Sequence, residues 1–471
     1  MELFLYNTLS LQKEKFEPIK SGEAGIYTCG PTVYNYAHLG NLRTYLFQDF
    51  LVRTLAYKGY KVKRVMNITD VGHLSGDGDM GEDKMEKGSA REGRSAWDIA
   101  AYYTDAFKED MDLLNMIAPD VYCRATDNIP EQIDLVKQLE AKGFTYVTSD
   151  GVYFDTAKFP DYNRLSHLPL EELREGARVE KNPEKKNPTD FSLWKFSPIG
   201  EKRQMEWESP WGLGFPGWHL ECSAMSLKYL GEQRDIHCGG IDHINVHHTN
   251  EIAQSEAATG ETFFRYWLHG AFLNIAGGKK MAKSENNYLT VANALVNKEI
   301  NPLAFRYATL QVHYRKPMDY SENNLRQAEQ GLNSLYRQIA ALGSDIGEAG
   351  AGAKDEFVEA ITDDLNMPVA LSVLFKILKS EMPMPAKLGA ALDFDRVLGL
   401  NLASAISRFE ETAQKLELPE EVKCLLAARQ KARQEKDWEK ADALRVDITN
   451  LGYNLTDGPE GQQVELINHE E

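Results

Sequence analysis

The stretch INVHHTNE, residues 244–251, combines side-chain types that bind transition metals. His247 and Glu251 lie four residues apart, so on a helix they would share one face, and His248 would point away from that face. Imidazole and carboxylate groups are common zinc ligands, and a structural zinc ion normally has four protein ligands. The sequence therefore predicts a metal site whose remaining ligands come from other segments.

Cysteine thiolates are candidates for the missing ligands, and the chain has five widely spaced cysteines: Cys29, Cys123, Cys222, Cys238 and Cys424. An odd number at such spacing is not typical of a disulfide framework, so each is expected to be a buried thiol, a metal ligand or a nucleophile. A local metal site is an alternative, built from the side chains His237, Cys238, His243 and His247. From the residues alone, both arrangements remain open.

A second motif, HLGN at residues 38–41, lies where a predicted strand passes into a predicted helix. The N-terminus of a helix presents unpaired N–H groups and a partial positive charge, which favour phosphate binding. His38 and Asn41 can donate hydrogen bonds to phosphate oxygens, and Gly40 allows a ligand to approach the backbone closely. A capped helix with a surface histidine is the alternative interpretation.

The stretch GGKKMAKSENN, residues 277–287, places Lys279, Lys280 and Lys283 close together in an otherwise acidic chain. Clustered ammonium groups suit a triphosphate-like group whose negative charge grows in a transition state. A solvated basic loop is the alternative interpretation. The net charge of −18 argues against non-specific nucleic-acid binding over the whole surface, but it permits a local basic track.

The elements that must position these motifs follow from the periodicity of apolar residues. Residues 25–30 and 61–69 are predicted strands, and the run between them has the spacing of a helix. A strand, a helix and a strand in this order form a β-α-β unit with parallel strands. Because the strand-then-helix pattern resumes at residues 235–258, the sequence predicts an α/β fold whose parallel sheet is split by an insertion.

The predicted insertion covers residues 110–205, with a helix at 128–143 and a hairpin at 144–156 that turns at Asp150-Gly151. Residues 343–354 are rich in Gly and Ala and are predicted to be a linker. Helices are predicted beyond it at residues 355–381, 385–400, 402–417 and 419–450. A chain of 471 residues is too long for one hydrophobic core, so several domains are expected.

Membrane and export signals are not expected in this chain. No stretch approaches the length of uncharged apolar sequence that a membrane-spanning helix needs, and the first residues lack the pattern of a signal peptide. The expected location is therefore the cytoplasm, with no membrane partner.

The paired motifs, in this order and on this split sheet, resemble the class I aminoacyl-tRNA synthetases. HLGN is similar to the HIGH motif of that class, and KMAKS is similar to its KMSKS motif. Four segments, at residues 27–41, 215–225, 235–256 and 436–445, resemble the cysteinyl-tRNA synthetases in particular, and the resemblance runs over essentially the whole chain. The resemblance implies a Rossmann-type catalytic domain with a connective insertion, followed by an α-helical bundle and a small anticodon-binding module.

The resemblance also implies domain boundaries. The two halves of the catalytic domain would be residues 1–110 and 208–270, with the connective insertion at 111–207 between them. The remaining regions would be a stem-contact region with the lysine loop, a helical bundle and an anticodon-binding module, at residues 271–342, 355–417 and 418–471.

The ligands of one zinc ion follow from the same resemblance, and they are Cys29, Cys222, His247 and Glu251. The zinc ion would also take the thiolate of the substrate cysteine, because metal coordination lowers the pKa of a thiol. Serine offers no comparable soft ligand, so the ion would select cysteine without an editing domain.

Other residue roles are implied in the same way. Thr69, Trp218 and Asp242 would form the cysteine pocket together with Cys29. The residues expected to bind ATP, with Mg²⁺, are His38, Gly40, Asn41, Lys280 and Lys283, and all of these except Gly40 are expected to be catalytic. The sequence departs from the family pattern at Asn41 and Ala282, which replace a histidine and a serine, and in a longer loop at residues 68–88.

The C-terminal region is expected to bind RNA. Basic and aromatic side chains that suit phosphates and stacked bases occur together at Arg429, Arg433, Lys436 and Trp438. An amphipathic helix with a solvated face is the alternative. The expected activity is ATP-dependent activation of L-cysteine and its transfer to tRNA(Cys) by a monomer; the alternatives are a related ligase that passes cysteine to an amino-sugar and a non-catalytic paralogue.

Overall fold

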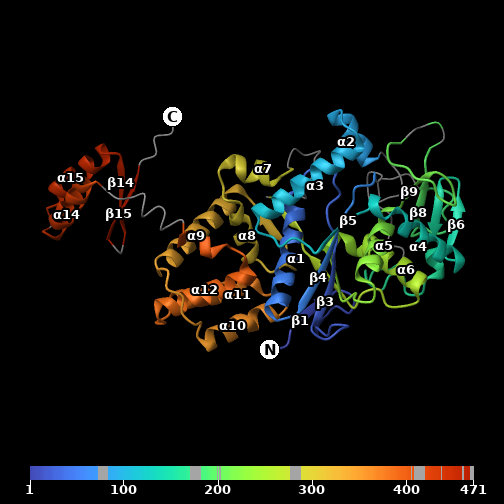
Figure 1. Ribbon diagram of the computed structural model, residues 1–471, viewed down its shortest axis with the longest axis horizontal. Coiled ribbons are helices and arrows are strands. Elements are labelled where there is room, and N and C mark those ends of the chain that lie inside the picture. The colour runs from blue at the N-terminus through green and yellow to red at the C-terminus, as the bar shows by residue number, and fades with distance from the viewer. Residues whose placement is uncertain are drawn as a thin grey trace. The chain divides into compact units, whose positions relative to one another are not determined.

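The computed structural model describes residues 1–72, 83–169, 182–198, 200, 203–275, 288–404, 406–407, 419–435, 437–458 and 461–466. These residues form two compact units, Met1–Ala403 and Ser404–Glu471, and each unit is described separately below (Figure 1). Among the described helices, none is long and apolar enough to cross a membrane.

A five-stranded parallel sheet lies at the centre of the first unit, in the order β11-β10-β3-β4-β5. Its strands are β3 (Glu23–Thr28), β4 (Lys61–Ile68), β5 (Val121–Arg124), β10 (Ile236–Gly240) and β11 (Tyr266–Gly270). Every residue of β10 and β11 is buried, as expected for parallel strands that are covered on both faces. The predicted parallel sheet is confirmed, and helix α1 (Leu39–Tyr57) connects β3 to β4 as predicted.

The order of the strands reverses at β3. The chain adds β4 and β5 on one side of β3 and later adds β10 and β11 on the other side. In open parallel sheets, ligands bind beyond the carboxyl ends of the strands at such a switch point. Here the backbone N–H of Cys29, directly after β3, donates to the carbonyl oxygen of Cys238 in β10 at 3.1 Å.

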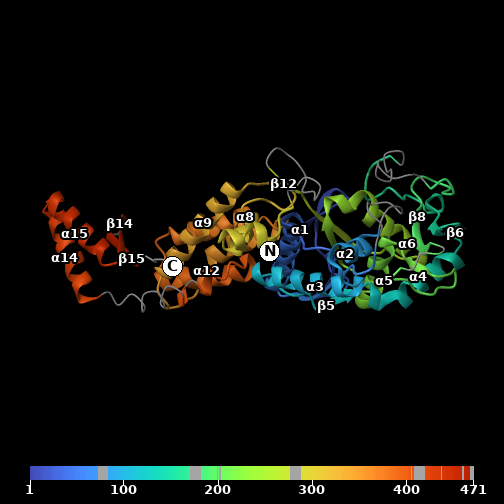
Figure 2. The same ribbon diagram turned by 90° about the horizontal axis from the view of Figure 1, so that it is seen from above.

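The insertion between β5 and β10 carries a second, antiparallel sheet in the order β6-β7-β8-β9. Its strands are β6 (Thr145–Thr148), β7 (Gly151–Phe154), β8 (Phe191–Phe196) and β9 (Gly214–Pro216), and helices α4 (Ile129–Ala141), α5 (Trp218–Leu230) and α6 (Thr249–Thr259) lie beside it (Figures 1 and 2). The predicted helix and hairpin are confirmed, but the predicted turn is wrong by one residue. Gly151 pairs with Thr148, so the turn is Ser149-Asp150.

Helices α2 (Lys84–Glu92) and α3 (Ala96–Leu113) connect β4 to β5. Smaller elements complete this part of the unit: β1 (Phe4–Asn7), β2 (Gln12–Lys15), β12 (Leu273–Ile275), α7 (Val291–Ala294), α8 (Pro302–Leu310), β13 (Met318–Tyr320) and α9 (Glu322–Ala340). Strand β12 pairs in parallel with β13, so the chain on either side of residues 276–287 is held together.

Three further helices close the first unit: α10 (Ala351–Thr362), α11 (Met367–Leu378) and α12 (Met384–Leu398). Two predictions need correction here. The predicted linker becomes helical at Ala351, and the predicted helix over 355–381 is broken where Asp364 and Leu365 have positive φ angles of 56° and 54°. The break is stabilised because the Asp364 carboxylate accepts hydrogen bonds from the backbone N–H of Tyr6 at 2.9 Å and from the Tyr314 hydroxyl at 2.7 Å.

The second unit contains helices α14 (Glu420–Gln434) and α15 (Trp438–Asn450), which together replace the single predicted helix at 419–450. An antiparallel hairpin that was not predicted follows, with strands β14 (Tyr453–Gly458) and β15 (Gly461–Leu466). Most of the predicted helix at 402–417, and the predicted boundary at residue 418, lie outside the described residues.

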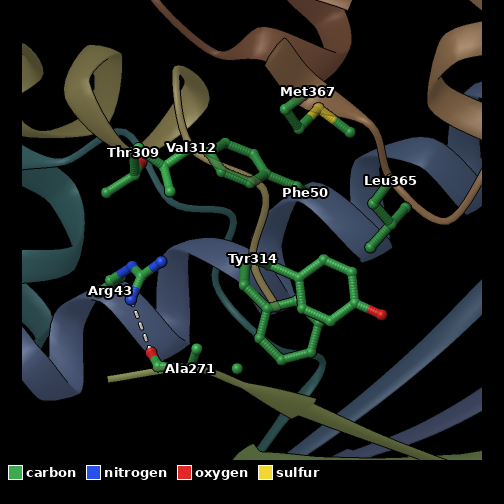
Figure 3. Close-up of a pocket in the computed structure, with 10 residues that line it drawn as sticks. Arg43, Phe50, Ala271, Thr309, Val312, Tyr314, Leu365 and Met367 are labelled. Atoms are coloured by element: carbon green, nitrogen blue, oxygen red, sulfur yellow. Dashed lines mark hydrogen bonds between the residues drawn. The ribbon is translucent and has the colours of Figure 1, made fainter. Parts of the chain in front are cut away.

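A small hollow lies between α1, the end of β11 and the start of α11 (Figure 3). Arg43 from α1 lines it and donates to the carbonyl oxygen of Ala271 at 2.8 Å. The hollow holds about 10 Å³, which is room for about one water molecule. It is therefore a packing feature that joins α1 to the end of the sheet, and it is too small for a substrate.

Candidate active site and metal centre

A cavity of about 570 Å³ opens beyond the carboxyl ends of β3 and β10, at the switch point of the sheet. This volume is typical of a small-molecule site. Residues predicted to bind metal, cysteine or ATP line it, namely Cys29, His38, Asn41, Thr69, Trp218, Asp242 and His247. Segments that are far apart in the sequence therefore meet at one site.

The four predicted zinc ligands lie together at the base of this cavity. Ligand atoms of Cys29, Cys222, His247 and Glu251 all lie within 4.8 Å of one another, and all four residues are buried. The donors come from four elements: the end of β3, helix α5, a π-helical turn at Ile244–His248 and helix α6. Two sulfur atoms, one imidazole and one carboxylate form a donor set that suits zinc.

The electrostatics of this cluster also fit a cation. Glu251 Oε1 is buried and lies 2.9 Å from His247 Nε2, yet the two atoms are not aligned as a hydrogen bond. Burial disfavours ionisation of Glu251, but His237 and His247 outweigh it and lower the carboxyl pKa to about 2. The carboxylate is therefore ionised over the whole physiological range and available to a metal ion. Burial raises the pKa of the Cys29 thiol, so binding of a metal ion there must displace a proton.

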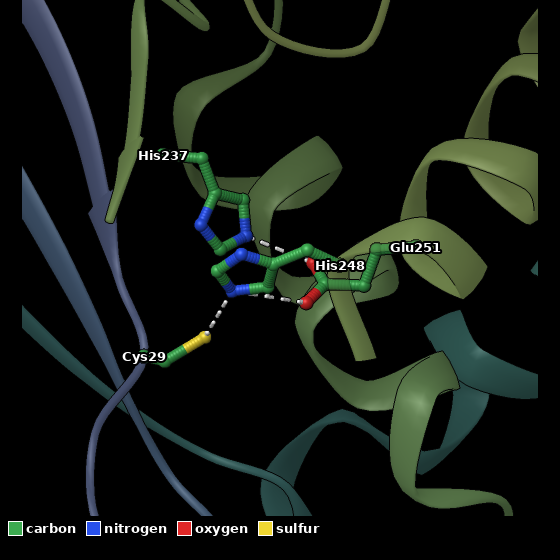
Figure 4. Close-up of side chains that lie close together, drawn as sticks. All are labelled: Cys29, His237, His248 and Glu251. Atoms are coloured by element: carbon green, nitrogen blue, oxygen red, sulfur yellow. Dashed lines mark hydrogen bonds and ion pairs between the residues drawn. The ribbon is translucent and has the colours of Figure 1, made fainter. Parts of the chain in front are cut away.

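A second possible donor group overlaps the first and consists of Cys29, His237, His248 and Glu251, again within 4.8 Å (Figure 4). His248 Nε2 lies 3.3 Å from Cys29 Sγ, so the prediction that His248 points away is wrong. The reason is the π-helical turn, which has more residues per turn than an α-helix and brings the consecutive His247 and His248 toward Cys29 and Glu251. The base of the cavity thus holds more donors than one zinc ion normally uses.

The alternative of a local site within residues 237–247 is not supported. Neither of the two donor groups found among the described residues contains Cys238 or His243. His237 and Cys238 are consecutive in β10, and consecutive side chains of a strand point to opposite faces. His237 therefore faces Glu251, with 2.9 Å between Nε2 and Oε2, and the fully buried Cys238 packs on the opposite face of the sheet.

Additional histidines orient the donors. His219 Nδ1 lies 2.9 Å from His247 Nδ1, and His269 Nε2 lies 2.8 Å from His248 Nδ1. Hydrogen bonds at the second ring nitrogen fix the tautomer and the ring orientation of a metal-binding histidine. The sequence reasoning did not identify His219 or His269, because each is distant from its partner in the sequence and no local spacing marks it.

The HLGN motif forms the N-terminus of α1. His38 is the N-cap: its Nδ1 accepts from the backbone N–H of Asn41 at 3.1 Å, and Asn41 Oδ1 accepts from the backbone N–H of His38 at 3.3 Å. In the neutral ring, Nε2 then carries the hydrogen and is a donor. A Cβ at Gly40 would lie 2.9 Å from the His38 ring, so this glycine makes room for the imidazole. The capped-helix alternative is thus correct as to local structure, and both side chains still line the cavity.

The predicted cysteine pocket surrounds the same base. Trp218, the first residue of α5, stacks on His247 with 4.4 Å between ring centroids. The Thr69 hydroxyl donates to buried Glu221 at 2.9 Å, which fixes the orientation of its oxygen. Asp242 lies two residues after the end of β10 and also lines the cavity.

Two predicted groups, the ATP-binding residues and the tRNA-binding residues, fall only partly within the described residues. Lys280, Lys283 and Lys436 lie outside the described residues. In the second unit, Arg429 is 1% exposed and donates to Gln462 Oε1 at 2.6 Å, so its guanidinium is committed to packing against the hairpin and is not presented to RNA. Trp438 is 58% exposed, and the Arg433 guanidinium lies 6.0 Å from its ring centroid.

The parallel sheet, its insertion and the cavity over an HLGN-capped helix define a class I aminoacyl-tRNA synthetase. Residues 15–330 match the family model for the class I (C) tRNA synthetase catalytic domain. The fold also resembles that of a Mycobacterium tuberculosis methionyl-tRNA synthetase, with a TM-score of 0.58 and 16% identity over 82% of this chain and 93% of that chain.

Residues 416–464 match the cysteinyl-tRNA ligase anticodon-binding domain. A cysteine–tRNA ligase of Burkholderia lata is 48% identical over 98% of this chain and 97% of its own length. Another, from Treponema denticola, is 43% identical over 97% of this chain and 98% of its own length. The chain belongs to the cysteinyl-tRNA ligase family.

Proposed function

We propose that this chain is a cysteine–tRNA ligase that activates L-cysteine with ATP and transfers it to tRNA(Cys), selecting the thiol through a zinc ion. The observation that carries the proposal is the buried group of Cys29, Cys222, His247 and Glu251 at the base of the cavity. Family membership supports the overall activity, and this donor group supports the means of selection.

Zinc, when bound, would supply a soft Lewis acid that holds the substrate as a thiolate. Cys29, Cys222, His247 and Glu251 would hold the ion, and His219 would keep the imidazole of His247 in one orientation. A pocket of fixed shape separates –SH from –OH poorly, whereas a metal–sulfur bond has no equivalent for serine. The donor set thus accounts for selection between two side chains of nearly equal shape.

Activation needs no protein nucleophile. The carboxylate oxygen of cysteine attacks the α-phosphorus of ATP, the bond from that phosphorus to the bridging oxygen of the β-phosphate breaks, and pyrophosphate leaves; Mg²⁺ bound with ATP would offset the phosphate charge. His38 Nε2–H and the side-chain amide of Asn41 would donate to phosphate oxygens, since both side chains line the cavity and the capping box holds them at the start of α1. Catalysis then rests on orientation and charge neutralisation, to which Lys280 and Lys283 would contribute. A ribose hydroxyl of the terminal adenosine of tRNA then attacks the carbonyl carbon of the cysteinyl-adenylate, the bond from that carbon to the phosphate oxygen breaks, and AMP leaves.

The test combines charging with metal analysis. Purified protein is given unfractionated tRNA, ATP, Mg²⁺ and either labelled cysteine or labelled serine. We expect base-labile tRNA label from cysteine alone and about one zinc per chain; the Cys222→Ala variant should lose zinc and raise KM for cysteine about a hundredfold or more. Cys424→Ala, which removes an exposed thiol, is the matched control and should change neither quantity.

Two outcomes would contradict the proposal. Cysteine-dependent pyrophosphate exchange without tRNA charging would favour the amino-sugar ligase alternative, against which the match of residues 416–464 already argues. Normal zinc content and normal cysteine affinity in Cys222→Ala would refute the four-ligand site. The monomeric state, the cytoplasmic location and the domain boundaries given above remain predictions.

A further inference from the structure

One cationic side chain in the cavity is not used by the mechanism above. Among the described residues that line the cavity, Lys84 is the single lysine or arginine. It is the half-buried first residue of α2, and it follows the longer stretch of sequence after Thr69 that departs from the family pattern. A cation at this place has consequences for a zwitterionic substrate.

The start of α2 is firmly held. Asp83 caps the helix by accepting from the backbone N–H groups of Met85 at 2.7 Å and Glu86 at 3.1 Å. The Asp83 carboxylate also forms a largely buried ion pair with Arg203, whose guanidinium packs 3.6 Å from the ring centroid of Phe215 and donates to the carbonyl oxygen of Gly72. The ion pair between Asp83 and Arg203 therefore holds the backbone next to Lys84 in place.

Aromatic rings direct Lys84 into the cavity. Its Nζ lies 5.7 Å from the ring centroid of Trp218 and 6.0 Å from that of Tyr34, within the range of cation–π attraction. Trp218 also stacks on His247, so one indole contacts both the metal cluster and the lysine. The same cavity is therefore lined by members of the metal-donor group, by Asp242 with its carboxylate and by Lys84 with its ammonium group.

These three features match the three polar groups of cysteine. Only two carbon atoms separate the sulfur of cysteine from its carboxyl group, so a thiolate held at the metal cluster keeps the carboxylate close to Trp218. An anionic carboxylate is favoured next to a partly desolvated ammonium group and disfavoured next to Asp242. The same carboxylate must approach the negative α-phosphate, and a cation between them reduces the repulsion.

We propose that Lys84 binds the carboxylate of the substrate cysteine and positions it for attack on the α-phosphate. This inference rests on the proposed function and adds a residue to it. The Asp83–Arg203 pair acts through Lys84 by fixing the start of α2, so Arg203 is a positioning residue.

The test measures binding rather than turnover. Isothermal titration of the zinc-loaded protein with L-cysteine is compared with titration by cysteamine, which has the thiol and the amine but no carboxylate. In Lys84→Met, we expect cysteine affinity to fall about tenfold to a hundredfold and cysteamine affinity to stay unchanged, as for loss of one charge-assisted hydrogen bond. Lys87→Met, which removes an exposed lysine from the same helix, should leave both affinities unchanged.

The possible results separate the two proposals. Equal losses for cysteine and cysteamine in Lys84→Met would show a structural role and overturn the assignment, as would an unchanged cysteine affinity. Lys84→Arg should retain more cysteine affinity than Lys84→Met if charge is the cause. If the wild-type protein binds neither thiol, the proposed function itself fails, whereas thiol binding that is insensitive to Lys84 refutes only this inference.

Discussion

The strongest stability prediction concerns Arg306, which is completely buried in α8. Its Nη2 lies 2.6 Å from Oδ2 of the equally buried Asp49 in α1. The same guanidinium donates to the carbonyl oxygen of Leu398 at 2.7 Å and to those of Leu114 and Asn115 at 3.0 Å each. Helix α1 is thereby joined near its middle to three other segments: α8, the chain at Leu114 and Asn115, and the end of α12.

These contacts determine how much the free energy of unfolding falls when the Arg306 side chain is removed. Breaking a buried ion pair by deleting one partner costs about 3–5 kcal/mol, because it leaves the other charge buried and unpaired. Arg53 still pairs with Asp49 at 2.7 Å and limits the loss. The abandoned carbonyl oxygens add to the cost, so we expect Arg306→Met to lower the free energy of unfolding of residues 1–403 by about 3–4 kcal/mol.

Urea unfolding followed by tryptophan fluorescence measures this change, because Trp438 is the one tryptophan of the sequence beyond residue 403. Arg326→Met is the matched control: its pair with Glu322 spans 3.3 Å between side chains that are 48% and 44% exposed, so its loss should stay within about 0.5 kcal/mol. A loss below about 1 kcal/mol for Arg306→Met would refute the reasoning, and so would equal losses for the two variants.

Two other predictions follow from single side chains. Burial, with a smaller contribution from Glu109, raises the pKa of Asp110 from 3.8 to about 7, so the folded protein keeps a proton that the unfolded chain releases. The free energy of unfolding should therefore fall by at most about 4 kcal/mol as the pH rises from about 4 to about 7. Asp110→Asn should reduce the difference between the melting temperatures measured at pH 5 and pH 8. An unchanged difference in this variant would contradict the prediction. Trp438→Ala should lower kcat/KM for tRNA charging about tenfold through lost stacking while leaving cysteine-dependent pyrophosphate exchange intact, and a loss in both assays would contradict an RNA-contact role.

Local pattern was sufficient for much of the fold. The capping signal at His38, the helical spacing after it and the strand at residues 61–69 predicted the β-α-β unit that the structure contains. The break at Asp364 was not predictable, because it depends on hydrogen bonds from Tyr6 and Tyr314, which lie far away in the sequence. Similarly, the hairpin β14–β15 has no apolar alternation strong enough to distinguish it from a frayed helix end.

In the candidate site, too, some features were predictable from the sequence and others were not. The resemblance supplied Cys29, Cys222, His247 and Glu251 as a set, and the structure brings their ligand atoms together. The π-helical turn reversed the expectation for His248, since one additional residue in a turn rotates a side chain onto a different face. Lys84 was overlooked because its environment comes from Trp218 and Tyr34, and no local spacing connects the three.

The sequence by itself determined which chemistry is available: soft and imidazole donors for a metal, a capped helix for phosphate, and lysines that are clustered along the chain. Only the tertiary structure decided which donors meet, because Cys29 and His248, 219 residues apart, become neighbours through the pairing of β3 with β10. Such pairing depends on burying both faces of a parallel sheet under helices from the whole unit. Local periodicity specifies the faces of each element, but the packing of all of them together sets the order of the strands.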